Sequence, residues 1–413
     1  MSAGLRAGYK QSEVGVIPAD WGVRRIADIA AVGSGGTPRR EVAAYWGGSI
    51  PWITTSQVDF GEITEADQFI TDEGLQNSAT KLLPPGTLLM ALYGQGKTRG
   101  KVGVLAMHAA TNQACASISL REDVSREFVL HFLTSRYEQI RNSSNSGSQE
   151  NLNGNIVKGT LIAFPPLPEQ RAIAAALFDV DALLGGLDSL IAKKQGLKVA
   201  AMQQLLTGQT RLPGFSGEWE VKRLPELADI RSGGTPSTSV AQYWDGNIPW
   251  CTPTDITALK GKKFLSETAR MITQQGLKAS SAEMIPTLSI VMTSRATIGE
   301  CAINIVPVST NQGFKNFIPF DATDLEFLYY LLITQKQGFI TLCGGSTFLE
   351  IGKTQLVAYQ VRLPSTKAEQ TAIAVILSDM DTELAALQAR RSKTQALKQA
   401  MMQELLTGRI RLV

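Results

Sequence analysis

The chain has 413 residues, of which 44% are hydrophobic, and carries a formal net charge of +3 at pH 7. This length is sufficient for two to four domains with their own cores, and the mild positive charge permits nucleic-acid binding without requiring it. No apolar run approaches the ~20 residues of a membrane span, and the four scattered cysteines form no CxxC pair, which argues against a disulfide framework and a structural zinc. We expect a soluble cytoplasmic protein with reduced thiols.

The sequence contains the same unit twice. Residues 21–54 align without gaps on 219–252, with 18 of 34 positions identical, and 169–212 align on 369–412, with 23 of 44 identical. The offset changes only from 198 to 200 between the two matches. This pattern indicates a tandem duplication in which a globular part precedes a helical part, and two such copies can be related by a pseudo-two-fold axis.

Each copy opens with a tryptophan, followed by a Ser-Gly-Gly-Thr-Pro turn at 34–38 and 232–236. The next segments, YWGGSIPWITT and YWDGNIPWCTP, indicate a packed loop that leads into a short strand. Their four tryptophans have the residue type of base-stacking platforms. Because both copies keep them, a role as core aromatics is favoured; they are Trp46, Trp52, Trp244 and Trp250.

The middle of each copy contains short β-like runs, at 86–90 and 101–104 in the first copy and at 288–292 and 300–303 in the second. A Thr-Asn-Gln string recurs at 111–113 and 310–312, and helical stretches are expected over 125–140 and 325–340. Polar loops follow at 142–151 and 344–348. We therefore predict a mixed α/β domain with a small, twisted sheet in each copy.

The prolines of Phe164-Pro-Pro-Leu-Pro168 predict a stiff connector, after which one helix is expected from Glu169 to about Leu206. A Thr-Gly pair follows each long helix, as a glycine stop requires. Apolar residues recur with the alternating spacing of a coiled-coil seam. The predicted helix-pairing and partner-subunit residues are Ile173, Leu177, Val180, Leu184, Leu187 and Ile191 in the first copy, and Ile373, Leu377, Met380, Leu384 and Leu387 in the second.

We predict that the two helices pair with each other in antiparallel orientation, with one globular domain at each end of the rod. The seam weakens at Lys194, Lys198, Arg391 and Thr394, where Leu190, Leu197 and Leu205 continue the apolar pattern on a shifted face. The predicted fold class is α+β, with two pseudo-symmetric mixed α/β domains separated by two long antiparallel coiled-coil helices. The predicted boundaries are 1–165, 166–210, 211–364 and 365–413.

These elements together resemble the specificity subunits of type I restriction-modification systems. The resemblance rests on Ile17-Pro-Ala-Asp-Trp21, on the duplicated SGGTP and YW-G-IPW strings, on PPLPEQ at 165–170, and on LLTG followed by Arg-Leu at 205–212 and 405–412. It covers the whole chain. The second PPLPEQ is altered to Leu363-Pro-Ser-Thr-Lys-Ala-Glu-Gln370, which weakens the prediction of a rigid second connector.

The resemblance implies a non-catalytic subunit whose two globular domains are target-recognition domains, each specific for one half of a bipartite DNA site. The helices would act as a spacer and would dock two methyltransferase subunits, through which restriction subunits join the complex. No cofactor is expected on this chain; S-adenosylmethionine, ATP and Mg are expected on the partner subunits. No membrane association is implied.

Catalytic signals are weak. The chain has only two histidines, His108 and His131, for which structural or surface roles are favoured. Residues 91–98 (ALYGQGKT) look like a phosphate-binding P-loop with its first glycine replaced, but the second copy lacks the Lys-Thr pair. A glycine-flexible basic loop that approaches a phosphate backbone is the favoured interpretation of 93–101.

Base recognition requires Arg or Lys for guanine and Asn or Gln for adenine, on loops or helix ends that can enter a groove. The DNA-binding candidates of the first domain are Thr55, Ser56, Gln57, Gln95, Lys97, Arg99, Lys101, Ser148, Gln149 and Asn151. Those of the second are Thr254, Ser294, Arg295, Thr297, Lys315, Ser346 and Thr347. The cluster Lys260-Gly-Lys-Lys263 is interpreted as a solvated turn, with phosphate contact as the alternative.

Two further hypotheses remain open. The chain could be a tandem-repeat scaffold that binds proteins and no DNA, or an enzyme that hydrolyses a nucleotide at residues 91–98. DNA binding in the presence of methyltransferase partners separates the first alternative from a recognition subunit, and ATP hydrolysis by the purified chain would support the second.

Overall fold

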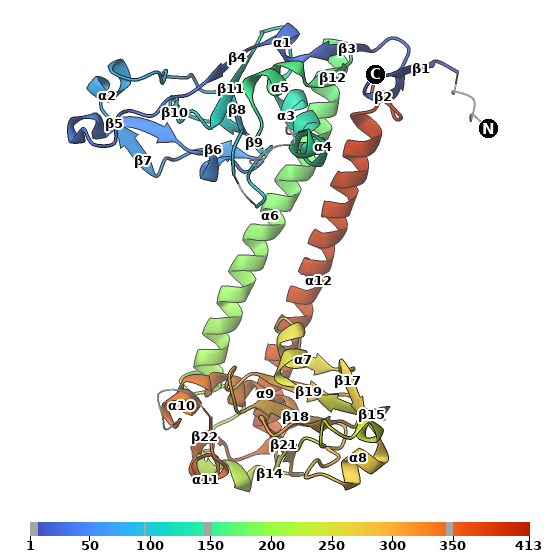
Figure 1. Cartoon of the computed structure of the whole chain (residues 1–413). Coiled ribbons are helices and arrows are strands. Elements are labelled where there is room, and N and C mark those ends of the chain that lie inside the picture. The colour runs from blue at the N-terminus through green and yellow to red at the C-terminus, as the bar shows by residue number, and fades with distance from the viewer. Residues whose placement is uncertain (1–6, 95, 144–150, 344–349) are drawn as a thin grey trace. The chain divides into compact units, whose positions relative to one another are not determined.

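The computed structural model describes residues 7–94, 96–143, 151–343 and 350–413. The chain forms two compact units, one of Met1–Asp188 with Arg390–Val413 and the other of Ser189–Ala389. The boundary between the units falls inside both long helices, α6 (Leu167–Leu205) and α12 (Lys367–Leu405). Each unit therefore contains one globular part and half of each long helix (Figure 1).

The globular part of the first unit contains two small sheets. A five-stranded sheet has the order β4-β11-β8-β9-β6, in which only the β9–β6 pair is parallel, and a three-stranded sheet has the order β10-β5-β7. A two-stranded ribbon, β12–β3, and a hairpin, β1–β2, complete the unit. The strands are β1 (Tyr9–Ser12), β2 (Gly15–Pro18), β3 (Gly22–Arg25), β4 (Ala30–Ser34), β5 (Trp46–Ile53), β6 (Glu62–Ile63), β7 (Gln68–Ile70), β8 (Leu88–Ala91), β9 (Val102–Leu105), β10 (Ala110–Thr111), β11 (Cys115–Leu120) and β12 (Leu161–Phe164).

The second unit repeats this topology. Its sheets have the orders β14-β21-β18-β19-β16 and β17-β15-β20, and its ribbon is β13–β22. The strands are β13 (Trp219–Arg223), β14 (Ala228–Ser232), β15 (Trp244–Cys251), β16 (Phe264–Leu265), β17 (Arg270–Ile272), β18 (Ser289–Thr293), β19 (Cys301–Asn304), β20 (Ser309–Thr310), β21 (Phe314–Pro319) and β22 (Gln360–Pro364). The predicted duplication of a mixed α/β domain is confirmed, but each copy has two sheets and a ribbon instead of one small sheet.

The predicted helical stretch after the five-stranded sheet is broken into two helices in each unit. Arg136 and Gln335 occupy the break, where each ends one helix and precedes the next. The short helices are α1 (Ile26–Ile29), α2 (Asp72–Gln76), α3 (Arg126–Ser135), α4 (Tyr137–Asn142), α5 (Gly154–Gly159), α7 (Pro253–Ala258), α8 (Gln274–Lys278), α9 (Leu325–Thr334), α10 (Lys336–Thr341) and α11 (Lys353–Ala358); the 3-10 turns are η1 (Ala43–Tyr45), η2 (Thr55–Gln57), η3 (Leu224–Glu226) and η4 (Ala241–Tyr243).

In the first unit the sheet, α3 and the ends of both long helices share one core. Phe128 and Phe132 of α3 pack in a cluster that also holds Ile173 and Leu177 from α6 and Leu405 from α12. Residues near the start of α6 therefore lie beside residues near the end of α12. Farther along, Lys398 Nζ lies 2.5 Å from Asp181 Oδ1, and Arg391 donates to Asp188 over 3.1 Å. Asp188 comes after Asp181 on α6, whereas its partner Arg391 comes before Lys398 on α12. The two helix segments are therefore antiparallel.

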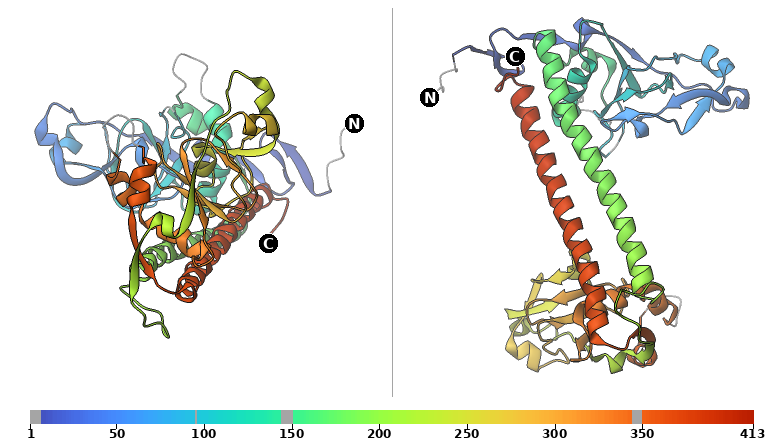
Figure 2. Two further views of the ribbon diagram at one scale, coloured as in Figure 1. Left: turned by 90° about the horizontal axis from the view of Figure 1, so that it is seen from below. Right: turned by 180° about the vertical axis from the view of Figure 1, so that it is seen from behind.

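The second unit has the same arrangement with the helix segments exchanged. Leu205 of α6 and Ile373 and Leu377 of α12 share a core with Phe327 and Tyr330 of α9. Lys194 Nζ lies 2.7 Å from Glu383, and Lys198 forms an ion pair with Asp381. This pairing is also antiparallel, and within the second unit the segments of α6 (green) and α12 (red) lie beside each other in the right view of Figure 2.

The helix seam follows the predicted spacing. Eight of its residues are buried, and Val180, Met380 and Leu387 are half-buried; the buried ones are Ile173, Leu177, Leu184, Leu187, Ile191, Ile373, Leu377 and Leu384. Of the residues expected to continue the apolar pattern on a shifted face, Leu190 and Leu197 are exposed, away from the seam, and Leu205 is buried. The seam instead continues through Lys194 and Lys198, whose ammonium groups form ion pairs with the facing helix.

The duplicated strings at the helix ends interact with each other. In the first unit Glu169 is fully buried, accepts a hydrogen bond from Trp21 Nε1 at 2.9 Å, and binds the guanidinium of Arg411 at 2.8 Å. In the second unit Glu369 binds Trp219 and Arg211 in the same way. A buried carboxylate is stable only with such partners. The Glu-Gln, Trp and Arg-Leu elements of the repeat therefore form one structural junction per unit.

The first long helix starts earlier than expected, and the stiffness of the connectors stays a prediction. α6 begins at Leu167, so Pro168 lies in its first turn, where a proline costs no helical hydrogen bond. In the altered second connector, Gln370 Nε2 still donates to Pro364 O at 3.2 Å, as Gln170 Nε2 does to Pro165 O at 2.9 Å. Gln170 Oε1 also accepts a hydrogen bond from Ser125 N at 3.0 Å, and Gln370 Oε1 accepts one from Asp324 N at 2.9 Å. Equivalent glutamines therefore tie both connectors to their domains.

The predicted α+β class and the antiparallel helix pairing are thus confirmed within each unit. The division into four segments at 165, 210 and 364 stays a prediction. Among residues 7–94, 96–143, 151–343 and 350–413, the helices include none with the length and apolarity needed to cross a membrane.

Candidate nucleic-acid interface

The duplicated Ser-Gly-Gly-Thr-Pro turn holds the two sheets of each unit together. In the first unit Gly36 N donates to Thr111 O at 2.8 Å, and a Cβ on Gly35 would lie 2.1 Å from that same oxygen. In the second unit Gly234 N donates to Thr310 O at 2.9 Å, and a Cβ on Gly233 would lie 2.0 Å from Asn311 O. The close approach of backbone to backbone explains why both copies keep the paired glycines and the Thr-Asn-Gln string.

A pair of tryptophans lies beside each of these turns. Trp46 and Trp52 meet edge to face with ring centroids 5.1 Å apart, and Trp244 and Trp250 do so at 5.0 Å. Trp52 and Trp250 are buried and donate from Nε1 to Gly36 O and Gly234 O, each at 3.0 Å. These contacts support the favoured role of core aromatics.

A guanidinium covers each tryptophan pair. Arg40 Cζ lies 4.0 Å from the ring centroid of Trp46, and Arg270 Cζ lies 3.9 Å from that of Trp244. Both arginines are exposed. Neither was among the candidates predicted from the sequence, because they occupy different positions in the two repeats.

The candidates of the first domain fall on three segments of the chain, 55–57, 95–101 and 148–151. Thr55, Ser56 and Gln57 form η2 directly after β5, where Ser56 is exposed and Gln57 Nε2 donates to Glu65 O at 3.2 Å. Between β8 and β9, Lys97 is exposed, and its carbonyl accepts a hydrogen bond of 2.6 Å from Tyr137 Oη.

Other first-domain candidates are constrained by neighbours. Lys101 Nζ lies 2.6 Å from Asp59 Oδ1, and Arg99 is buried with 6% of its surface exposed. Asn151 is half-buried, and the next residue, Leu152, donates from its backbone to Leu92 O at 3.0 Å. Gln95, Ser148 and Gln149 lie outside the described residues. DNA contact by any of these residues stays a prediction.

The second domain places its candidates around the loop between β18 and β19. Arg295 and Thr297 are exposed, whereas Ser294 is fully buried and does not reach solvent. Thr297 N donates to Arg295 O at 2.7 Å, and the intervening Ala296 has a φ of +59°. This left-handed backbone conformation is unfavourable for alanine and marks a tight, strained turn.

Charged side chains gather beside this turn. Arg295 Nε lies 2.9 Å from Glu350 Oε1, and burial of Lys315 on β21 lowers the pKa of its ammonium, to which the positive charges of Arg295 and Lys353 add. Glu350 acts in the opposite direction and raises the pKa of Lys315. On the sheet, Lys315 lies opposite Met292, three residues before Arg295, so these two predicted residues are brought to the same end of β18. Thr254 is exposed in the first turn of α7, and Ser346 and Thr347 lie outside the described residues.

The backbone pattern identifies equivalent positions in the two domains. Leu92 N donates to Ala114 O and Ser294 N to Gly313 O, while Leu92 O and Ser294 O accept from Leu152 N and Ile351 N. Tyr93 therefore corresponds to Arg295. By the same pairing Asn151 corresponds to Glu350. The exposed residues that follow β8 in the first domain and β18 in the second therefore differ in chemistry.

The segment that resembles a P-loop has a different fold. Such a loop leads from a strand into a helix whose N-terminus binds phosphate. Here Lys97 and Thr98 lie between β8 and β9, so a second strand follows the loop. The geometry supports the favoured interpretation of a basic loop. The other Gly-Lys-Thr string, at 352–354, starts the short helix α11.

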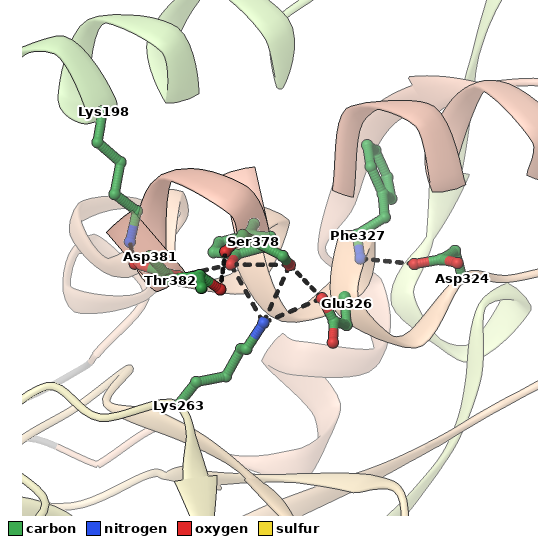
Figure 3. A network of polar contacts seen from close by, with 9 residues as sticks. Lys198, Lys263, Asp324, Glu326, Phe327, Ser378, Asp381 and Thr382 are labelled. Carbon is green, nitrogen blue, oxygen red and sulfur yellow. Dashed lines mark hydrogen bonds and ion pairs between the residues drawn. The ribbon is translucent and has the colours of Figure 1, made fainter. Parts of the chain in front are cut away.

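Lys263 departs from its predicted solvated turn. Its ammonium lies 3.0 Å from Glu326 Oε2 and 3.0 Å from Ser378 Oγ, and it joins a polar network that continues to Asp381 and Lys198 (Figure 3). Tyr330 Oη donates to Asp381 Oδ2 at 2.5 Å. This network fixes the second globular part to its segments of α6 and α12. Lys260 and Lys262 remain exposed.

In the first unit, a contact between His131 and Asp181 occupies the position equivalent to this network. His131 on α3 corresponds to Tyr330 on α9, and its Nε2 lies 4.0 Å from Asp181, which binds Lys398. Burial lowers the pKa of His131, with the charge of Lys398 acting in the same direction. His131 therefore has the predicted structural role, and His108 is exposed.

Comparison with known proteins identifies the family. The family described as type I restriction modification DNA specificity domain matches residues 18–191 and again residues 216–396. The chain is 39% identical over 175 residues to the type I restriction enzyme MjaIX specificity subunit of Methanocaldococcus jannaschii, a match that covers 42% of this chain and 40% of the relative. It is 25% identical over 433 residues to the putative MjaX specificity subunit of that organism, which covers 98% and 96% of the two chains.

Solved structures have the same fold. A chain from a structural study of complex assembly and conformational transition of the type I R-M system superposes with a TM-score of 0.63 at 20% identity, covering 95% of this chain and 99% of the other. The S subunit of a type I restriction-modification system from M. genitalium superposes with a TM-score of 0.58 at 15% identity, covering 93% and 96%. Because the family pattern matches both repeats, this chain belongs to the type I restriction-modification DNA specificity family.

Proposed function

We propose that this chain is the sequence-specific DNA-recognition subunit of a type I restriction-modification complex. Each globular domain recognises one half of a bipartite DNA site. The observation that carries this proposal is that one two-sheet scaffold occurs twice with different side chains at equivalent exposed positions, Tyr93 in the first domain and Arg295 in the second. A common scaffold with different surface chemistry suits two different half-sites.

The long helices set the spacing between the half-sites and dock two methyltransferase subunits. Each contains 39 residues, which corresponds to about 58 Å of helix. Both units also leave apolar side chains on α6 in solvent, such as Phe178 in the first and Leu197 in the second. A docked subunit that covered these side chains would remove their apolar surface from water. Restriction subunits join through this assembly.

The chain itself is non-catalytic in this proposal. Methyl transfer requires S-adenosylmethionine, and translocation requires ATP and Mg; we assign these cofactors to the partner subunits. We also infer a cytoplasmic location, since its substrate is cellular DNA.

Coexpression with the methyltransferase subunits, followed by sequencing of methylated adenines, tests the proposal. The expected result is one bipartite motif with a fixed spacer, absent when this chain is omitted. A gel shift with the same complex measures DNA binding directly. If the complete complex neither binds nor methylates DNA, the chain is a protein scaffold and the proposal is wrong.

A further inference from the structure

Both domains place a guanidinium against the equivalent tryptophan pair. In the first, Arg40 Cζ lies 4.0 Å from the centroid of Trp46 and 5.0 Å from that of Trp52. In the second, Arg270 Cζ lies 3.9 Å from Trp244 and 5.3 Å from Trp250. The corresponding Cζ-to-centroid distances of the two domains differ by 0.1 Å (4.0 and 3.9 Å) and 0.3 Å (5.0 and 5.3 Å).

The two arginines come from different places in the repeat. Arg40 follows the Ser-Gly-Gly-Thr-Pro turn, where the second repeat has Thr238 at the fixed offset of 198. Arg270 lies on β17 opposite Trp250, and the residue opposite Trp52 on β7 is Gln68. Arginine and a smaller polar residue have thus exchanged positions between the copies. The two guanidinium groups therefore lie against equivalent tryptophans although the two arginines are not at equivalent positions of the duplicated sequence.

The positive charge is held in place without an acidic partner. Arg40 Nη1 donates to the uncharged Oε1 of Gln68 at 2.7 Å, and Arg270 rests on the rings. Throughout the part of the chain that the structure describes, neither arginine forms an ion pair with a carboxylate. Arg295, in contrast, is paired with Glu350. An exposed cation–π contact alone contributes little to stability, so the retained charge points to an anionic ligand.

We propose that Arg40 and Arg270 bind equivalent backbone phosphates of DNA, one in each half-site. This inference rests on the proposed function. A guanidinium presents planar donors that match phosphate oxygens, and the tryptophan face restricts its orientation. Phosphate contacts position a protein on DNA without distinguishing bases. The contact is therefore common to both domains, while the loops that carry Tyr93 and Arg295 differ.

The test uses the complete complex with its methyltransferase subunits and two probes, a duplex carrying the mapped methylation motif and mixed-sequence duplex DNA. Arg40→Gln and Arg270→Gln should each weaken binding to both probes by the same factor, about 10- to 100-fold at low salt. The slope of log K against log salt should fall by about 1 for each arginine removed. The methylated motif itself should not change.

A matched exchange variant separates phosphate binding from a structural role. Arg40→Thr should lose affinity, and Arg40→Thr with Gln68→Arg should restore both affinity and salt slope, because the pair reproduces Thr238 and Arg270 of the second domain. Near-ultraviolet circular dichroism of the tryptophans checks that each variant is folded.

Three outcomes would overturn the inference: unchanged affinity and salt slope in folded Arg40→Gln and Arg270→Gln, a motif that becomes degenerate at one base, or no rescue by the exchange variant. A wild-type complex that fails to bind DNA would instead refute the proposed function, so the two failures are distinguishable.

Discussion

The guanidinium of Arg295 lies 2.9 Å from the carboxylate of Glu350, and the same two residues form an isolated antiparallel bridge between their backbones. Arg295 directly precedes Ala296 of the strained turn, and Glu350 directly precedes Ile351. The pair therefore ties this turn to the segment that leads into α11. Both side chains are partly exposed, so the ion pair itself adds little stability. Its effect is to hold Arg295 in one orientation at the surface of the second domain.

Arg295→Ala should weaken or relax recognition of the second half-site only. The cost should be about 1–3 kcal/mol at one base pair if the guanidinium makes two hydrogen bonds to guanine. Methylated-adenine sequencing would detect the loss as degeneracy at one position. Glu267→Ala, an exposed position of the same domain outside the DNA-binding candidates, is the control and should leave the motif unchanged. Degeneracy in the first half-site would count against the assignment.

Replacement of residues 22–165 by the corresponding domain of another family member should change one half of the recognised motif. The physical reason is that these residues form the sheets and loops of the first unit, whose core does not include the β18–β19 loop. The methylation motif of the chimaera gives the answer. A change in both halves would contradict recognition by independent domains.

Lengthening the helices should change the spacer of the motif. Four residues add about 6 Å, equivalent to one or two base pairs. The insertion belongs in α6 after Asp188 with a matching insertion in α12 after Ala389, because the Lys398–Asp181 and Lys194–Glu383 ion pairs then keep their partners. An unlengthened spacer in the methylation map of the folded variant would show that the helices do not set the distance.

Acid should destabilise the first unit through His131. Its folded-state pKa is lowered, chiefly by burial, so the unfolded chain binds a proton more readily. The stability contribution is therefore complete above the ordinary histidine pKa near 6.5 and is lost as pH falls below that value, at no more than about 1.4 kcal/mol per pH unit.

His131→Tyr introduces the residue that the second unit has at Tyr330, which hydrogen-bonds Asp381. Urea midpoints of wild type and variant, measured between about pH 5 and 7, should diverge as pH falls, with the variant less sensitive. Parallel curves would mean that another group controls the acid response.

Much of the fold could be predicted because it depends on short periodic patterns. The spacing of Ile173, Leu177, Leu184 and Leu187 is sufficient to indicate a helix seam, and the repeated glycines mark places where two backbones meet. The doubling of these patterns predicted two equivalent domains. Buried apolar positions follow from local sequence since each element must cover its own apolar face.

The polar contacts could not be predicted in the same way. Lys263 lies in a run that looks solvated, but its partners Glu326 and Ser378 are 63 and 115 residues away in sequence. Lys194 interrupts the apolar seam and has a glutamate on the facing helix. Arg40 and Arg270 contact equivalent tryptophans, but sequence alignment does not match them, because Arg40 lies in a turn and Arg270 lies on β17. Long side chains reach partners that residue spacing does not reveal.

The junction between Glu169 and Arg411 has a consequence for synthesis of the protein. The second unit is continuous, from Ser189 to Ala389, whereas the first needs Arg390–Val413 to complete its core. Leu405 and Arg411 are synthesised after all of residues 189–389, so the second unit can fold before the core of the first is complete. This order reverses the usual N-to-C progression of folding during translation. Limited proteolysis of stalled nascent chains should find residues 219–364 protected before residues 21–164; earlier protection of the N-terminal domain would exclude it.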